Sequence, residues 1–183
     1  MHTWLRTLVA GALVAVLPSM ALAQGRVPRT DSGAVGGDIG IFLPDEEQLG
    51  SALALEGFYE YYFGPRTSLR IGMGWTSPEF DRDPNGSIRN VRIALDGVYN
   101  WEGGDVHPFV GAGIGVYFLQ QRDRGESVGD SESKFGGTIF GGVEVFTSRT
   151  VSVKGEARYH LVADAGAYDP DGFALSIGLK KYF

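Results

Sequence analysis

The chain has 183 residues, which suits one domain with a core of its own. Its formal charge of −6 at neutral pH argues against a nucleic acid as a partner. It has no cysteine, so the sequence predicts neither a disulfide nor a thiolate metal site.

The first 23 residues are typical of a secretory signal peptide. A short head with one arginine precedes an apolar run at residues 8–17, and a proline ends that run. Ala21 and Ala23 place small residues where signal peptidase cleaves. We expect cleavage after Ala23, which leaves residues 24–183 as one exported β-barrel domain. The alternative is an N-terminal membrane anchor, but crossing a bilayer takes about twenty apolar residues.

Strand-like alternation dominates the mature chain, and no stretch of it carries the apolar stripe of an amphipathic helix. We expect eight strands, over residues 34–43, 53–63, 67–76, 89–101, 108–120, 135–146, 151–161 and 172–183.

The connections between these strands alternate in length. "GPR", "EGGDVH" and "TSRT" are short, whereas "PDEEQLGSA", "SPEFDRDPNGSI", "QRDRGESVGDSESK" and "VADAGAYDPD" are longer and mostly acidic. Such alternation is typical of an up-and-down barrel that crosses a membrane. The acidic residues expected in the long extracellular loops are Asp45, Glu46, Glu47, Glu79, Asp81, Asp83, Asp123, Glu126, Asp130, Glu132, Asp164 and Asp169.

The stretch "VSVKGEARYHL" (residues 151–161) carries apolar side chains on one face and charges on the other. In a membrane barrel the apolar face contacts lipid, because a base at mid-bilayer costs about 2–4 kcal/mol. Tyr and Trp residues near strand ends on the apolar face suit the membrane–water interface. We therefore predict an all-β fold, an eight-stranded antiparallel up-and-down transmembrane β-barrel. The alternative is a soluble lipocalin-like barrel with the apolar face turned inward.

The polar faces of the strands carry nearly balanced charges, as a closed interior requires, since an unpaired buried charge costs several kcal/mol. We expect a lumen ion-pair network of Asp38, Glu56, Glu60, Arg70, Arg92, Asp96, Glu144, Lys154, Glu156, Arg158 and Lys180. His160 shares these faces, and Gly111, Gly113 and Gly115 leave room for long side chains to cross the lumen. The pattern favours a rigid, ion-paired plug. The alternative is a narrow polar pore lined by the same residues.

Three stretches together resemble the small eight-stranded outer-membrane β-barrels of Gram-negative bacteria, the OmpA-type and OmpX-type proteins. They are "GFYEYYFGPRTSLRIGMGW", "HPFVGAGIGVYF" and the terminal "LSIGLKKYF". The resemblance implies a monomer in the bacterial outer membrane, in contact with its lipid and lipopolysaccharide. It also implies that the barrel-assembly machinery reads a signal made of Leu175, Ile177, Leu179 and Phe183. Lys181 departs from that signal, since the third residue from the end is usually aromatic or apolar.

The resemblance leaves other functions open. OmpW-like barrels, which have the same strand number, are proposed to pass apolar molecules, and some OmpX-like barrels bind host molecules. Other small barrels modify lipid A, but the deacylases carry His and Ser two residues apart. Here Val162 takes the place of that serine after His160, so we expect no catalytic residue.

The segment "DRDPNGSI" places Asp81, Asp83 and Asn85 at the first ligand positions of a calcium loop. Arg92 stands where such a loop requires a bidentate Glu, so we expect a hairpin loop that turns at Pro-Asn-Gly. The function we predict is a structural outer-membrane barrel with acidic extracellular loops, without a metal or another cofactor.

Overall fold

The computed structural model describes residues 28–80, 83–101, 104–124, 126–163 and 170–183. The predicted signal peptide, with its cleavage residues Ala21 and Ala23, lies outside the described residues. None of the described residues forms a helix that is long and apolar enough to cross a membrane.

The described chain is built from strands. They are β1 (Ser32–Pro44), β2 (Ala52–Tyr62), β3 (Thr67–Thr76), β4 (Glu79–Phe80), β5 (Asp83–Asn100), β6 (Val106–Asp123), β7 (Glu126–Ser127), β8 (Glu132–Phe146), β9 (Val151–Val162) and β10 (Gly172–Tyr182). Eight of them are long and correspond to the eight predicted strands. The two-residue strands β4 and β7 only prolong the hairpins at the tips of β5 and β6.

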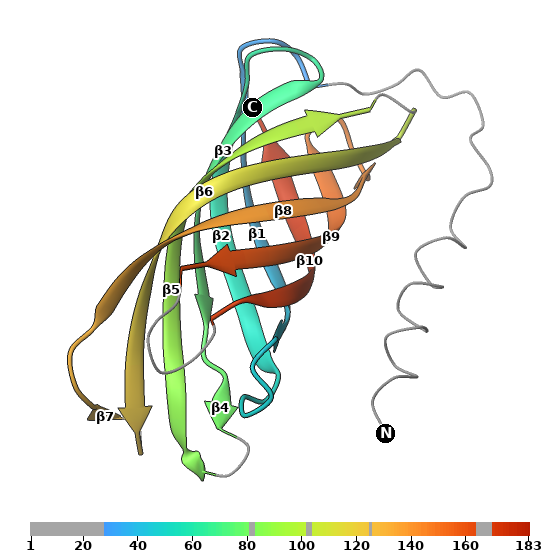
Figure 1. The fold of residues 1–183 in the computed structure, drawn as a ribbon. Coiled ribbons are helices and arrows are strands. Elements are labelled where there is room, and N and C mark those ends of the chain that lie inside the picture. The colour runs from blue at the N-terminus through green and yellow to red at the C-terminus, as the bar shows by residue number, and fades with distance from the viewer. Residues whose placement is uncertain (1–27, 81–82, 102–103, 125, 164–169) are drawn as a thin grey trace.

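The eight long strands close into an antiparallel barrel (Figure 1). Each pairs with the next along the chain, in the order β1, β2, β3, β5, β6, β8, β9 and β10. The last strand pairs back with the first, from Ala34 opposite Tyr182 to Pro44 opposite Gly172. Closure lets neighbouring strands satisfy the backbone hydrogen bonds of the wall, which is what allows strands to cross a lipid bilayer. The predicted all-β fold, an eight-stranded antiparallel up-and-down barrel, is therefore confirmed.

The two ends of the barrel differ. β2–β3, β5–β6 and β8–β9 are joined at one end, here called the short-turn end, where Phe183 also lies. β4 and β7 mark the opposite, long-loop end, which lies at the bottom of Figure 1. The predicted alternation of short and long connections is present in this arrangement.

The strands at the long-loop end extend further than predicted. β5 and β6 each have 18 residues and remain paired as far as Gly86 and Asp123. The prediction of a turn at Pro-Asn-Gly was wrong, because these residues lie within β5, whose Asp83 pairs with Phe80 of β4. Ile88, in the extended part of β5, is buried and lines the same small void as Leu49 of the β1–β2 loop. Several acids predicted in loops therefore lie in strands: Glu79, Asp83, Asp123, Glu126 and Glu132.

The faces of the strands follow the predicted alternation. The outer wall is formed by large apolar side chains, of which Phe135 (79 % exposed) and Ile114 (72 %) are the most open. Ser152 and Lys154, which alternate with the exposed Val153 on β9, are buried inside. This is the reverse of a soluble barrel, so the lipocalin-like alternative does not hold for these strands.

Aromatic side chains gather near the strand ends of the outer wall. Tyr99 and Trp101 meet edge to face with ring centroids 5.1 Å apart, and Tyr59 lies 6.3 Å from Phe183. Towards the other end, the hydroxyl of Tyr159 donates a hydrogen bond to a carboxylate of the β1–β2 loop. An aromatic ring with a polar tip suits the boundary between hydrocarbon and water.

Candidate functional site: the barrel lumen

The lumen is narrow enough for side chains to fill it, as expected for eight strands. β6 makes room for them with glycines on its inner face. The Phe140 ring packs over Gly111 and the Asp96 carboxylate over Gly113, each at the place where a Cβ atom would otherwise lie. Bulky groups from β5 and β8 can therefore meet inside the barrel.

The first layer closes the short-turn end. Tyr62, Phe146 and Tyr182 are buried together, with the Tyr62 and Tyr182 rings 5.8 Å apart and the Phe146 and Tyr182 rings 5.2 Å apart. The Lys180 ammonium donates to the Tyr62 hydroxyl at 2.9 Å and pairs with the carboxylate of Glu144, also at 2.9 Å. An aromatic floor thus rests directly on an ion pair.

The second layer is centred on Glu156. Its Oε2 pairs at 2.8 Å with both Arg70 and Lys154, and its Oε1 pairs with Arg158 at the same distance. These three bases come from β3 and β9, so the layer ties strands on opposite walls together. Three cations around one carboxylate provide the compensation that burial of a charge requires.

The bases of this layer also hold the neighbouring acids. Arg70 contacts Glu60 at 3.2 Å, Lys154 contacts Asp38 at 2.7 Å and Arg158 contacts Asp96 at 2.8 Å. Aromatic rings flank the two arginines. The Arg158 guanidinium lies 4.0 Å from the Phe140 ring centroid, and that of Arg70 lies 4.6 Å from the Phe58 centroid. Cation–π contacts of this kind are worth more when water is excluded.

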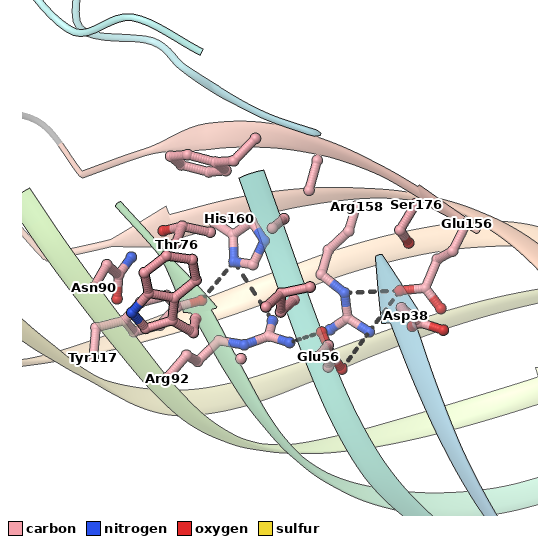
Figure 2. A pocket seen from close by; sticks show the side chains of 16 residues that line it. Asp38, Glu56, Thr76, Asn90, Arg92, Tyr117, Glu156, Arg158, His160 and Ser176 are labelled. Atoms are coloured by element: carbon pink, nitrogen blue, oxygen red, sulfur yellow. Dashed lines mark hydrogen bonds and ion pairs between the residues drawn. The ribbon is translucent and has the colours of Figure 1, made fainter. Parts of the chain in front are cut away.

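The third layer lies closer to the long-loop end and is drawn in Figure 2. Arg92 of β5 pairs with Glu56 of β2 at 2.5 Å. The Tyr117 hydroxyl lies 3.0 Å from Nδ1 of His160, and an Arg92 nitrogen lies 3.5 Å from the same atom. Because a guanidinium can only donate, Nδ1 accepts, and the neutral imidazole carries its proton on Nε2.

A small cavity, here called the chamber, lies between parts of this layer and the second, which meet where Arg158 approaches Glu56 at 3.8 Å. It has about 50 Å³ of free space and is lined by Asp38, Glu56, Asn90, Arg158 and His160 among others (Figure 2). An apolar layer covers it on the long-loop side. That layer contains the buried residues Phe42, Leu49, Ile88 and Leu119.

All eleven residues predicted for the lumen network point into the barrel, and each takes part in at least one ion pair. Ten are buried, and Glu56 is nearly so. His160 lies among them. The sequence reasoning missed the layers that close the two ends. Alternation already placed Tyr62 and Tyr182 inward, but no pattern marked Leu49, which a loop folds over the lumen.

The four residues predicted as an assembly signal lie on the outer face at the end of the chain. Ile177, Leu179 and Phe183 are exposed, and Leu175 is half-exposed. Lys181, which departs from the signal, donates a hydrogen bond to Thr150 at 2.7 Å. Tyr182 faces inward, so it does not replace the outward aromatic residue.

The described residues contain no group of three His, Asp or Glu side chains placed to hold a metal ion. The described residues do not include Asp81 of the calcium-like segment or the predicted loop acids Asp164 and Asp169. The close neighbours of the His160 ring are Tyr117, Arg92 and Phe42.

Comparison with known proteins agrees with this architecture. A family described as outer membrane protein beta-barrel domain matches residues 9–183. Neisserial surface protein A (NspA) is 13% identical with a TM-score of 0.67, over 83% of this chain and 96% of that chain. The outer membrane protein OprG from Pseudomonas aeruginosa is 12% identical with a TM-score of 0.67, over 87% and 99%. The N-terminal β-barrel domain of Pseudomonas aeruginosa OprF is 12% identical with a TM-score of 0.64, over 85% and 100%. No curated protein matches the chain in sequence.

Proposed function

Because the chain belongs to the outer membrane protein beta-barrel domain family, we propose that it is a structural barrel of the bacterial outer membrane whose lumen is a plug. The observation that carries this proposal is the filling of the lumen by side chains from end to end. Solutes would have to pass the Tyr62–Tyr182 floor, two layers of ion pairs and the apolar layer at Leu49.

The proposed work of such a barrel is mechanical, without catalysis or a cofactor. Ion pairs that join opposite walls resist deformation, because separating them leaves charges buried without a partner. The short-turn end faces the periplasm, as short turns do in this class of barrel, and the long loops face outward. Acidic residues such as Glu46 and Glu47 keep those loops solvated next to lipopolysaccharide. The closed ladder and the apolar outer wall support a monomer surrounded by lipid.

Assembly is proposed to start from the C-terminal strand. Ile177, Leu179 and Phe183 form an exposed apolar row on β10 that the barrel-assembly machinery can bind during insertion. The same row then faces lipid in the finished barrel.

Single-channel conductance of residues 24–183, refolded into a planar bilayer, tests the plug. We expect silence from protein shown to be folded by its β-sheet circular dichroism. A variant with Phe42→Ala and Leu119→Ala, which opens only the apolar layer, should also be silent because the ion pairs lie beneath it. A steady open state of the native protein would overturn the proposal. It would make Arg92, Glu144 and Arg158 pore-lining residues and favour a narrow transport pore.

A further inference from the structure

The charges inside the barrel do not balance. Between the aromatic floor and the apolar layer, the described residues include six acids and five bases. His160 adds no charge, because its Nδ1 faces the Arg92 guanidinium, which can only donate. The other buried histidine, His107, lies at the floor, packed on Phe146 with its Nε2 2.9 Å from the Gly104 oxygen. The six acids outnumber the five bases by one, so this set carries one excess negative charge even though each acid has an ion-pair partner. An uncompensated buried charge costs several kcal/mol, so a closed lumen requires one more positive charge.

The structure places this deficit at one pair of carboxylates. Asp38 of β1 and Glu56 of β2 stand directly opposite each other in the antiparallel ladder, and both point inward. Directly opposed side chains have Cβ atoms about 4.5–5.5 Å apart, and like charges in this position repel. Two carboxylates that share a site favour binding of a proton to one of them.

Asp38 has the weaker compensation of the two. Its ion-pair partner is Lys154, which also serves Glu156. β10 offers Asp38 only the bare backbone of Gly178, against which its Oδ1 lies. The charged groups that face Asp38 are therefore Lys154 and Glu156 from β9 and Glu56 from β2. The charge of Glu56 is better compensated, because Arg92 lies 2.5 Å from its carboxylate and Arg158 lies 3.8 Å from it.

Several oxygens at the wall of the chamber beside this pair have no hydrogen-bond donor among the described residues. Within the described part of the chain, four acceptor oxygens at its wall have no hydrogen-bond donor: Asp38 Oδ1, Glu56 Oε1, Thr76 Oγ1 and Asn90 Oδ1. A water molecule needs roughly 10–15 Å³ of such space, so the chamber of about 50 Å³ has room for a small cluster. Water and an acidic proton both supply the hydrogens that these oxygens require.

We propose that the chamber binds a cluster of water molecules together with one proton, held on Asp38 and shared with Glu56 through the water. The proton is the missing positive charge, and the cluster satisfies the four oxygens. The barrel thus contains a buried, neutral carboxyl group in a lumen otherwise held by ionised pairs. The proposal does not depend on whether the lumen conducts.

Infrared spectroscopy of the barrel refolded in a detergent without ester groups tests the proton. The carbonyl stretch of a protonated carboxyl group is separate from the carboxylate bands, and no lipid ester carbonyl then overlaps it. At neutral pH we expect this band in the native protein and in Glu47→Gln, which removes an exposed loop acid. We expect its loss in Asp38→Asn. Glu56→Gln serves as the second variant should Asp38→Asn fail to fold. It should lose the band too, since Asp38 is then the only carboxylate left of the pair and no longer shares its site with a second negative charge.

Three outcomes would overturn the proposal. One is the absence of the band from the native protein, and another is its survival in both variants. The third is a urea midpoint of the native barrel that falls when sodium is exchanged for the bulky choline cation at equal ionic strength. That result would show that a small cation, and not a proton, supplies the positive charge.

Discussion

At the scale of single residues, Arg70 shows why the lumen uses guanidinium groups. Its Nε contacts Glu60 and its Nη1 contacts Glu156, so one planar group bridges acids on β2 and β9. The same plane stacks on Phe58. A lysine offers a compact point charge and lacks both the fork and the flat face, so an exchange for lysine would not be conservative here.

Replacing Arg70 by leucine should strongly destabilise the barrel. Removal of one partner from a buried ion pair costs about 3–5 kcal/mol, since the charge that remains keeps its burial cost. The free energy of unfolding, measured by urea titration in lipid vesicles, should fall by this amount. Arg149→Leu, at an exposed position in the β8–β9 turn, should change it by no more than about 0.5 kcal/mol. Equal effects of the two substitutions would contradict the network.

At the scale of strands, β6 shows how an element makes room for its neighbours. Its inner face carries Gly111, Gly113 and Gly115, over which groups from β5 and β8 lie. Its outer face carries Val110, Ile114 and Phe118, which contact lipid. Over this glycine-rich middle part the strand therefore turns its side chains to the membrane and its bare backbone to the lumen.

The substitution Gly113→Ala should cost about 1–3 kcal/mol of stability, as overpacking of a filled core does. A Cβ atom there would overlap Asp96 Oδ1 and lie 2.7 Å from the backbone oxygen of Leu95. The matched control is Gly57→Ala on β2, where a Cβ atom meets nothing within 4 Å. Urea midpoints of both variants provide the measurement, and a midpoint for Gly113→Ala at or above that of Gly57→Ala would refute the packing argument.

At the scale of the whole molecule, closure separates two environments that hold the barrel together differently. Outside, apolar side chains are solvated by lipid. Inside, ion pairs lie in a space from which most water is excluded, with Glu60 and Arg70 both fully buried. Charges in such a space are poorly screened by salt, whereas exposed charges are screened over about 10 Å at 0.1 M ionic strength.

The stability of the barrel should therefore depend little on ionic strength. Raising sodium chloride from millimolar to molar concentration should leave the urea midpoint nearly unchanged, because the pairs that carry the stability are buried. The exposed acids of the loops differ from the buried pairs, because added salt screens their charges. A midpoint that falls steadily with salt would mean that water and ions penetrate the lumen, and it would also count against the plug.

The sequence alone determined the number of long strands, the face each strand turns to lipid and the set of charges in the lumen. These features are local, because side chains alternate with a period of two and the bilayer rejects the charged face. Even the 67–76 strand agrees with β3 to the residue.

Only the tertiary structure decided which charges meet, how far β5 and β6 extend and where the lumen is closed. Arg70 and Glu156 are 86 residues apart in the chain, and their contact depends on how the strands are staggered around the closed barrel. Alternation says which way a side chain points but not how high it lies in the barrel. Leu49 reaches the lumen from a loop, where no periodic pattern exists to reveal it. The charge deficit at Asp38 likewise appears only once the partners of every other acid are known.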